Sequence, residues 1–125
     1  MALQIKRIYD PFQESDGVRF LVDRLWPRGV SKENARLDGW LKDLAPSSRL
    51  RAWFGHKAEN FDEFAALYRA ELDASAKAQA AARQVVLKGR KTTVTLLYGA
   101  KDTKINHAAV LKEYLDEKSD SASII

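Results

Sequence analysis

The 125-residue chain is 46% hydrophobic and 30% charged, which is typical of one globular domain large enough to bury a core. It has no cysteine, so disulfides, a thiolate nucleophile and a cysteine-based zinc site are excluded. The formal net charge of +4 is spread among acidic residues along the chain, as on an ordinary solvated surface, and allows a nucleic-acid partner without specifying one.

Two strands are expected near the N-terminus. Residues 3–9 alternate apolar and polar side chains, and this pattern breaks at Asp10 and Pro11. Residues 14–17 form a turn signal. The apolar run at residues 18–22 predicts the second strand.

Two helices are expected next. Ser31 is suited to cap the first helix, and Pro46 ends it. Its apolar face has helical spacing and consists of Leu37, Trp40, Leu41 and Leu44. A short helix follows Ser47 or Ser48 and closes at Gly55. The apolar residues of this short helix are Leu50, Trp53 and Phe54. We expect both tryptophans of these two faces in the core.

Two longer helices complete the helical region. Asn60 and Glu63 form an N-cap signature before the first of them. Its apolar stripe consists of Phe61, Phe64, Ala65, Tyr68 and Leu72. The alanine-rich residues 75–87 predict the next helix, which Gly89 is expected to stop.

The C-terminal part contains one strand and one helix. Residues 92–98 are nearly all β-branched or apolar, which predicts a strand buried on both faces. A helix is expected over residues 105–117. Long helical connections between strands favour parallel pairing. We therefore expect an α/β fold in which helices pack on a small, at least partly parallel sheet of about three strands.

The expected organisation is a single α/β domain over residues 1–118 followed by a flexible tail over residues 119–125. No apolar run approaches the roughly 20 residues of a membrane span. The N-terminus also lacks the apolar stretch of a signal peptide. We therefore expect a cytoplasmic protein with no membrane partner.

Two loops carry the residues of greatest chemical interest. Ligands of α/β proteins bind beyond the carboxyl ends of strands, and residues 23–29 and 99–106 occupy such positions. If the second and third strands are parallel neighbours, both loops open at the same edge. The candidate catalytic residues are Asp23, His56 and Asp102, and the candidate ligand-binding residues are Arg24, Trp26, Arg28, Lys101 and Asn106.

The charged candidates each have a structural alternative. Asp23 can act as a general base or metal ligand, or it can form an ion pair that fixes a loop. Arg24 and Arg28 can hold a phosphate group, or they can pair with Asp23 and Asp102. Lys101 precedes the N-terminal end of the last expected helix, a position that favours anions.

Trp26 and His56 also have two possible roles each. Trp26 can stack on a ligand ring or cap the core, and His56 can exchange protons or complement a helix dipole. The chain has two histidines without metal-site spacing, so no metal site is predicted. No Walker loop or dinucleotide fingerprint occurs, so the sequence specifies no cofactor.

Five segments carry a family resemblance along nearly the whole chain. They read DRLWPRG at 23–29, WLKDLAPS at 40–47, LRAWFGH at 50–56, YRAEL at 68–72 and VTLLYGAKD at 94–102. In this order they resemble the YeaO-like branch of the DUF488 family. The resemblance implies an α/β fold and a shared pocket, but no established activity. Other branches carry a Cys-His-Arg element that would fall at residues 106–108, where Asn106 and Ala108 replace Cys and Arg, so no thiol chemistry is expected here.

Three hypotheses follow. The first is a small enzyme, or an enzyme-derived domain, that binds a phosphorylated or otherwise anionic small molecule in a strand-end cleft. The second is a basic nucleic-acid-binding module with Trp26 as a stacking platform. The third is a non-catalytic adaptor or oligomerising protein, which would expose an apolar patch. The oligomeric state is not specified.

Overall fold

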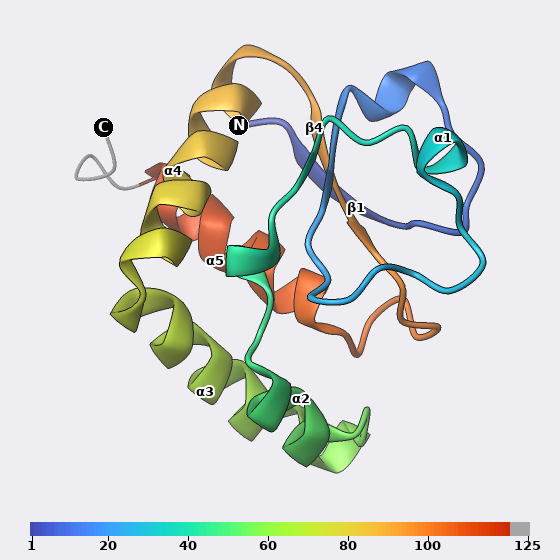
Figure 1. Cartoon of the computed structure of the whole chain (residues 1–125). Helices are drawn as coiled ribbons and strands as arrows, with labels where there is room; N and C mark the ends of the chain where they lie inside the picture. Colours follow the sequence, from blue (N-terminus) through green and yellow to red (C-terminus); the bar gives the residue numbers. More distant parts are fainter. Residues whose placement is uncertain (121–125) are drawn as a thin grey trace.

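A parallel sheet flanked by helices makes up the described part of the chain, residues 1–120, in a computed structural model (Figure 1). The strands are β1 (Leu3–Arg7), β2 (Val18–Leu21), β3 (Gly39–Trp40) and β4 (Val94–Tyr98). The helices are α1 (Lys32–Ala35), α2 (Ser48–Phe54), α3 (Phe61–Ala74), α4 (Ala76–Lys91) and α5 (His107–Asp120). Short 3-10 turns lie at Glu14–Asp16, Lys42–Leu44 and Ala58–Asn60. The predicted α/β class is confirmed.

The strand order in the sheet is β1-β4-β2-β3, and every neighbouring pair is parallel. β4 therefore lies between β1 and β2, and all five of its residues are buried, as its apolar sequence predicts. The sheet has four strands rather than about three, because β3 adds a short edge strand beside β2.

Two hydrophobic clusters lie on the two faces of the sheet. The larger joins the sheet to the longer helices through residues such as Phe20, Leu96, Tyr68, Val86 and Leu111. The smaller consists of Ile8, Leu21, Ala35 and Leu97, with Trp26, Val30, Leu37 and Trp40 packed against it. Figure 1 shows α4 and α5 on one side of the strands and α1 on the other. Adjacent strand residues, such as Phe20 and Leu21, thus serve opposite faces of the sheet.

A buried ion pair sits on the α1 side of the sheet. Asp16 and Arg19 are only 1% and 2% exposed, and the Arg19 guanidinium bonds the Asp16 carboxylate. Arg19 also donates to the carbonyl of Ala35 at 2.9 Å, while Lys6 Nζ lies 2.9 Å from Asp16 Oδ1. Burial alone would raise the pKa of Asp16, but bonds from Lys6, the Gln13 N–H and Arg19 outweigh it and lower the pKa. This network ties β1, β2 and α1 together.

The expected helix from Ser31 to Pro46 is wrong. Ser31 does cap a helix by accepting from Asn34 N, but α1 ends at Ala35, where Arg36 adopts a left-handed φ of 48°. The chain then pairs with β2, because Leu41 N donates to Leu21 O at 2.8 Å. Trp40 contacts the smaller cluster and Leu41 the larger, so adjacent side chains alternate as in a strand.

Three further expectations need correction. Gly89 does not stop α4, which continues to Lys91, because Gly89 does not adopt the left-handed φ that ends a helix; its missing side chain instead lets Met1 pack closely against α4. Trp53 is 42% exposed rather than in the core. The expected tail from residue 119 overlaps α5, which ends at Asp120, and residues 121–125 lie outside the described part.

Candidate functional site

The loops after β2 and β4 open at the same edge of the sheet, because these strands are parallel neighbours. Asp23 directly links them: its Oδ2 accepts a hydrogen bond from Gly99 N at 2.9 Å. A Cβ at residue 99 would lie 3.0 Å from that oxygen, so glycine permits the close approach. Asp23 therefore fixes the loop, but through Gly99 rather than through an arginine.

His107, the first residue of α5, contacts the same strand end. Its Nε2 lies 3.0 Å from the carbonyl of Val22 and 3.1 Å from Asp23 Oδ1. Since Nε2 faces two acceptors, we assign the ring proton to it. The hydrogen bond goes to Val22, which leaves Asp23 Oδ1 buried without a hydrogen-bond partner.

Arg24 and Trp40 connect this edge to the chain before α2. The Arg24 guanidinium donates to the carbonyls of Pro46 and Ala45 at 3.1 and 3.3 Å. Trp40 Nε1 donates to the carbonyl of Asp23 at 2.7 Å. The backbone that carries the charged side chains is thus held on both sides.

Two adjoining cavities lie beside these residues, and we call them together the cleft. The strand-end cavity, about 250 Å³, is lined by Tyr9, Asp23, Arg24, Leu25, Trp26, Pro27, Pro46, Arg51, His56, Gly99, Ala100 and His107. The helix-side cavity, about 220 Å³, is lined by Pro46, Ser48, Arg51, Ala52, Phe54, His56, Phe64 and His107. Their shared wall consists of Pro46, Arg51, His56 and His107.

His56 occupies an unusual backbone position at this wall. It follows Gly55, which ends α2 in the left-handed region, and has itself a φ of 57°. A left-handed conformation costs a non-glycine residue roughly 1–2 kcal/mol. The His56 ring packs against Phe54, with ring centroids 5.8 Å apart.

Tyr68 forms part of the buried support behind the cleft. Its hydroxyl donates to the carbonyl of Leu44, and its ring lies edge-on to His107 with centroids 6.2 Å apart. Burial, and next the charge of Asp23, raise the pKa of Tyr68 well above its ordinary value. The phenol therefore stays protonated as a hydrogen-bond donor.

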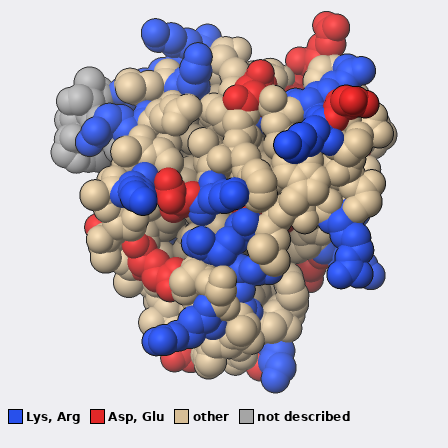
Figure 2. Space-filling view, in the orientation of Figure 1, with Lys and Arg blue, Asp and Glu red and all other residues tan. Residues whose placement is uncertain are grey.

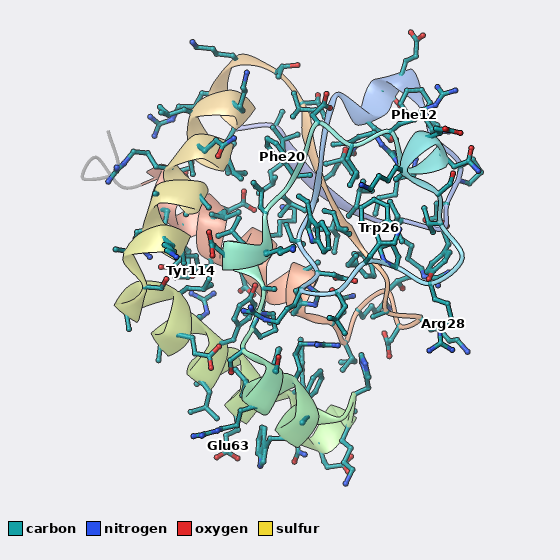
Figure 3. The ribbon with its side chains drawn as sticks, in the orientation of Figure 1. Phe12, Phe20, Trp26, Arg28, Glu63 and Tyr114 are labelled. Carbon is teal, nitrogen blue, oxygen red and sulfur yellow. The ribbon has the colours of Figure 1, made fainter. Side chains whose placement is uncertain are left out.

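The structure brings Asp23, Arg24, Trp26 and His56 to the strand-end cavity, but not the other sequence candidates. Arg28 and Lys101 are exposed and line neither cavity of the cleft. Figure 3 shows Arg28 pointing outward at the edge of the molecule.

The side chain of Trp26 is mainly structural. It lies between loop and sheet in Figure 3, donates from Nε1 to the carbonyl of Val30 at 2.7 Å and packs edge-on against Trp40. Trp26 also lines the strand-end cavity, but it packs against the smaller hydrophobic cluster, as the core alternative predicts.

Asp102 and Asn106 shape their own loop. Asp102 Oδ1 accepts from the backbone N–H groups of Ile105 and Lys104, and these two bonds lower the pKa of the Asp102 carboxyl. Asn106 is buried and its Oδ1 accepts from Ala109 N at 2.8 Å, which caps the start of α5. Neither side chain lines the cleft.

Sequence reasoning missed two cleft residues, Arg51 and His107. Arg51 lies on α2, and its place in the LRAWFGH segment beside His56 was the available signal. His107 begins α5 immediately after the candidate loop. Arg51 and His107 are more than 50 residues apart in the sequence. Only the tertiary structure shows that they line the same cleft.

Within residues 1–120 no group of three or more histidine, aspartate or glutamate side chains is arranged to hold a metal ion. In the same part of the chain, no helix combines the length and apolar character needed to cross a bilayer.

The family comparison agrees with the resemblance of the sequence segments. Residues 2–123 match the family DUF488-N3i, described as "Inactive DUF488-N3 subclade". The chain belongs to the DUF488 family. The family description fits a chain without cysteine, since the resemblance places the Cys-His-Arg element of other DUF488 branches at Asn106, His107 and Ala108.

Relatives within the DUF488 family cover almost the whole chain. The "Uncharacterized protein YeaO" of Escherichia coli K12 is 44% identical over 115 residues, which is 92% of this chain and 97% of that protein. "Uncharacterized protein Mb3100c" of Mycobacterium bovis and "Uncharacterized protein Rv3073c" of Mycobacterium tuberculosis H37Rv are each 42% identical over 114 residues, 91% of this chain and 93% of theirs. No solved structure matches the chain significantly.

Proposed function

We propose that this protein is an enzyme-derived domain that binds the anionic group of a small molecule in the cleft and does not turn it over. The observation that carries the proposal is the charge of the cleft. Arg24, Arg51, His56 and His107 line it, and Asp23 is the only carboxylate among its lining residues. Guanidinium and imidazole groups suit phosphate and carboxylate ligands.

The two arginines are available for such a ligand. Among residues 1–120, neither Arg24 nor Arg51 has a carboxylate oxygen within ion-pair distance. Arg24 uses two of its N–H groups on the carbonyls of Ala45 and Pro46, so its charge remains uncompensated by an acid. Arg51 is exposed on α2 and free to move toward a bound anion.

The backbone of His56 supports a ligand-binding role. Strained residues persist when the surrounding structure holds them, and they cluster at binding sites. Glycine would relieve the left-handed strain at this position, yet the chain places a titratable ring there, at the wall shared by both cavities.

Two features favour binding over turnover. Asp23 and His107, the natural acid–base pair of the cleft, are engaged with the backbone groups of Gly99 and Val22. The chain also lacks the cysteine that a thiol mechanism requires.

The surface charge favours a small anion over the nucleic-acid alternative. In Figure 2 lysine and arginine side chains are scattered over the face shown, and several lie beside aspartate or glutamate side chains. A nucleic-acid site is typically a continuous basic stripe.

The proposal is tested by isothermal titration calorimetry with inorganic phosphate and methyl phosphate. We expect saturable binding that Arg51→Ala weakens about 10- to 100-fold, the effect of losing a charge-assisted hydrogen bond. Arg49→Ala removes an equally charged neighbour that lies outside the cleft, and Arg28→Ala removes one from the loop after β2. Both controls are expected to bind like the wild type. No binding, or equal loss in all three variants, would refute the proposal.

The absence of turnover is tested separately with p-nitrophenyl phosphate. We expect no release of p-nitrophenol above the buffer rate at any pH between about 5 and 8, the range in which histidine titrates. Release that His107→Ala abolishes would contradict the non-catalytic part of the proposal.

A groove between α2 and α3 supports a second candidate function, self-association. The groove, about 580 Å³, is lined largely by apolar side chains, and Trp53 and Leu67 at its rim are 42% and 44% exposed. Arg49 and Glu63 also line it, and among residues 1–120 neither forms an ion pair. Glu63 points outward from the helices in Figure 3.

Because the groove carries a positive and a negative side chain, it can pair with a copy of itself across a two-fold axis. In such a dimer the large Trp53 and Leu67 would face the small Ala70 and Ala74 of the second copy. Sedimentation velocity over a hundredfold range of concentration tests this. We expect a dimer that Trp53→Ser abolishes and Arg49→Glu weakens, with Arg49→Glu/Glu63→Arg restoring it. A monomer at every concentration would exclude self-association.

A further inference from the structure

The two cavities of the cleft differ in chemistry. In the strand-end cavity, Asp23 and Arg24 and the backbone around Gly99 provide polar groups. In the helix-side cavity, the walls that are not shared are Ser48, Ala52, Phe54 and Phe64, so no charge is added there. The charged groups of that cavity are those of the shared wall.

The aromatic wall of the helix-side cavity is firmly built. Phe54 and Phe64 are 4% and 1% exposed and stack with ring centroids 4.2 Å apart. Phe61 extends the cluster, at 5.9 Å from Phe54. Because these rings belong to the main hydrophobic cluster, they offer a fixed apolar surface.

The size of this cavity limits what fits there. An apolar cavity of about 150 Å³ accommodates benzene. The helix-side cavity, at about 220 Å³, therefore has room for a six-membered ring.

The charges set the orientation of the ligand. The carboxylate of Asp23 lines the strand-end cavity and repels an anion there. An anionic group is therefore best placed at the shared wall, between Arg51 and His56. From there, the uncharged remainder of a ligand has the aromatic walls of the helix-side cavity beside it.

Resting on the proposed function, we infer that the ligand is an organic anion with one compact hydrophobic ring. Its anionic group lies against Arg51 and His56, and its ring enters the helix-side cavity against Phe54 and Phe64. The site thus distinguishes ring-bearing phosphates or carboxylates from inorganic phosphate. Burial of the ring provides this selectivity, because apolar area removed from water adds to the affinity that the charges supply.

The test compares two matched pairs of probes by isothermal titration calorimetry on the whole protein. Phenyl phosphate is compared with methyl phosphate, and benzoate with acetate. We expect the ring to tighten binding by about tenfold or more in at least one pair. Ala52→Leu, on the exposed side of α2, fills the helix-side cavity without touching the core. It is expected to abolish the advantage of the ring, so that phenyl phosphate and methyl phosphate bind with similar affinity, whereas Ala52→Ser keeps the advantage.

The outcomes separate this inference from the proposed function. Methyl phosphate binding that depends on Arg51, with no gain from the ring in either pair, overturns the inference alone. An advantage of the ring that survives Ala52→Leu also overturns it, because the ring then binds elsewhere. Absence of binding by any of the four probes defeats both. Circular dichroism and the thermal midpoint of each variant show whether it is folded.

Discussion

Replacement of Asp23 decides between its two sequence-based roles, a loop-fixing residue and a catalytic base. Asp23→Ala removes the charge-assisted bond to Gly99 N, which is 2.9 Å long, and such bonds contribute about 1.5–3 kcal/mol. It also removes the buried Oδ1 that lacks a hydrogen bond, which returns about 1 kcal/mol. The net loss of unfolding free energy is therefore about 0.5–2 kcal/mol, or roughly 2–10 °C in the thermal midpoint for a domain of this size.

Urea denaturation followed by tryptophan fluorescence measures this loss, and Asp23→Asn provides the control. The asparagine keeps an acceptor for Gly99 and removes the buried charge, so we expect its stability to lie within about 0.5 kcal/mol of the wild type. Both variants lose a negative charge from the cleft, so both are expected to bind methyl phosphate more tightly than the wild type. A stability gain in Asp23→Ala would refute the loop-fixing role, since removing a strained functional group stabilises a protein.

Three further predictions concern the framework of the site. Asp16→Asn leaves the buried Arg19 without its carboxylate and should cost about 3–5 kcal/mol in urea denaturation. The pKa of Asp16 is lowered in the folded protein, so the stabilisation from its carboxylate is present above the unfolded pKa and is lost as pH falls through the folded pKa. The free energy of unfolding of Asp16→Asn should therefore depend less on pH in this acid range than that of the wild type. His56→Gly should raise the free energy of unfolding by about 0.5–1 kcal/mol, because glycine relieves the left-handed φ at this position. The same variant should bind phosphate more weakly. Scanning calorimetry measures the first effect and titration calorimetry the second. Gly17→Ala should lower the thermal midpoint, because its Cβ would lie 2.2 Å from the carbonyl of Thr93 and its φ is 67°.

Much of the fold could be predicted because its strongest signals are local. The buried strand β4 follows from an unbroken run of apolar and β-branched residues, and the stripe of α3 follows from helical spacing. The helix predicted after Ser31 was wrong because the apolar residues of this segment have helical spacing by coincidence. Leu37 and Trp40 pack in the smaller cluster and Leu41 in the larger, a division that depends on the position of β2 and not on the segment itself.

The buried charges were hidden for a similar reason. Arg19 lies in an apolar run, and Asp16 lies in a turn signal, where an acid is ordinarily exposed. Buried charged groups need hydrogen-bond partners. Here the carbonyl of Ala35 at the end of α1 accepts from Arg19, and Lys6 donates to Asp16, so the partners come from segments that the local sequence does not reveal.

The candidate site could be predicted only where strand ends determine it. Asp23 and Arg24 follow β2 directly, so the α/β rule for strand ends identified them. The same rule failed for Lys101 and Asp102, because the loop after β4 turns on itself through the two backbone bonds to Asp102. That turn has a local signal, an aspartate that accepts from the N–H groups two and three residues later.

Under the proposed function, the strand-end edge binds an anion and offers no free group for catalysis. Asp23 and His107 still meet at the ends of β2 and β4, where a parallel sheet presents its reactive groups. Their hydrogen bonds, however, are to backbone groups. Asp23 accepts from Gly99 N, and His107 bonds the carbonyl of Val22, so both side chains hold the backbone that supports the cleft. Arg24 and Arg51, which have no carboxylate partner among residues 1–120, also line the cavity. On this proposal the cleft attracts an anion electrostatically but has no free group to attack it, which agrees with the family description "Inactive DUF488-N3 subclade".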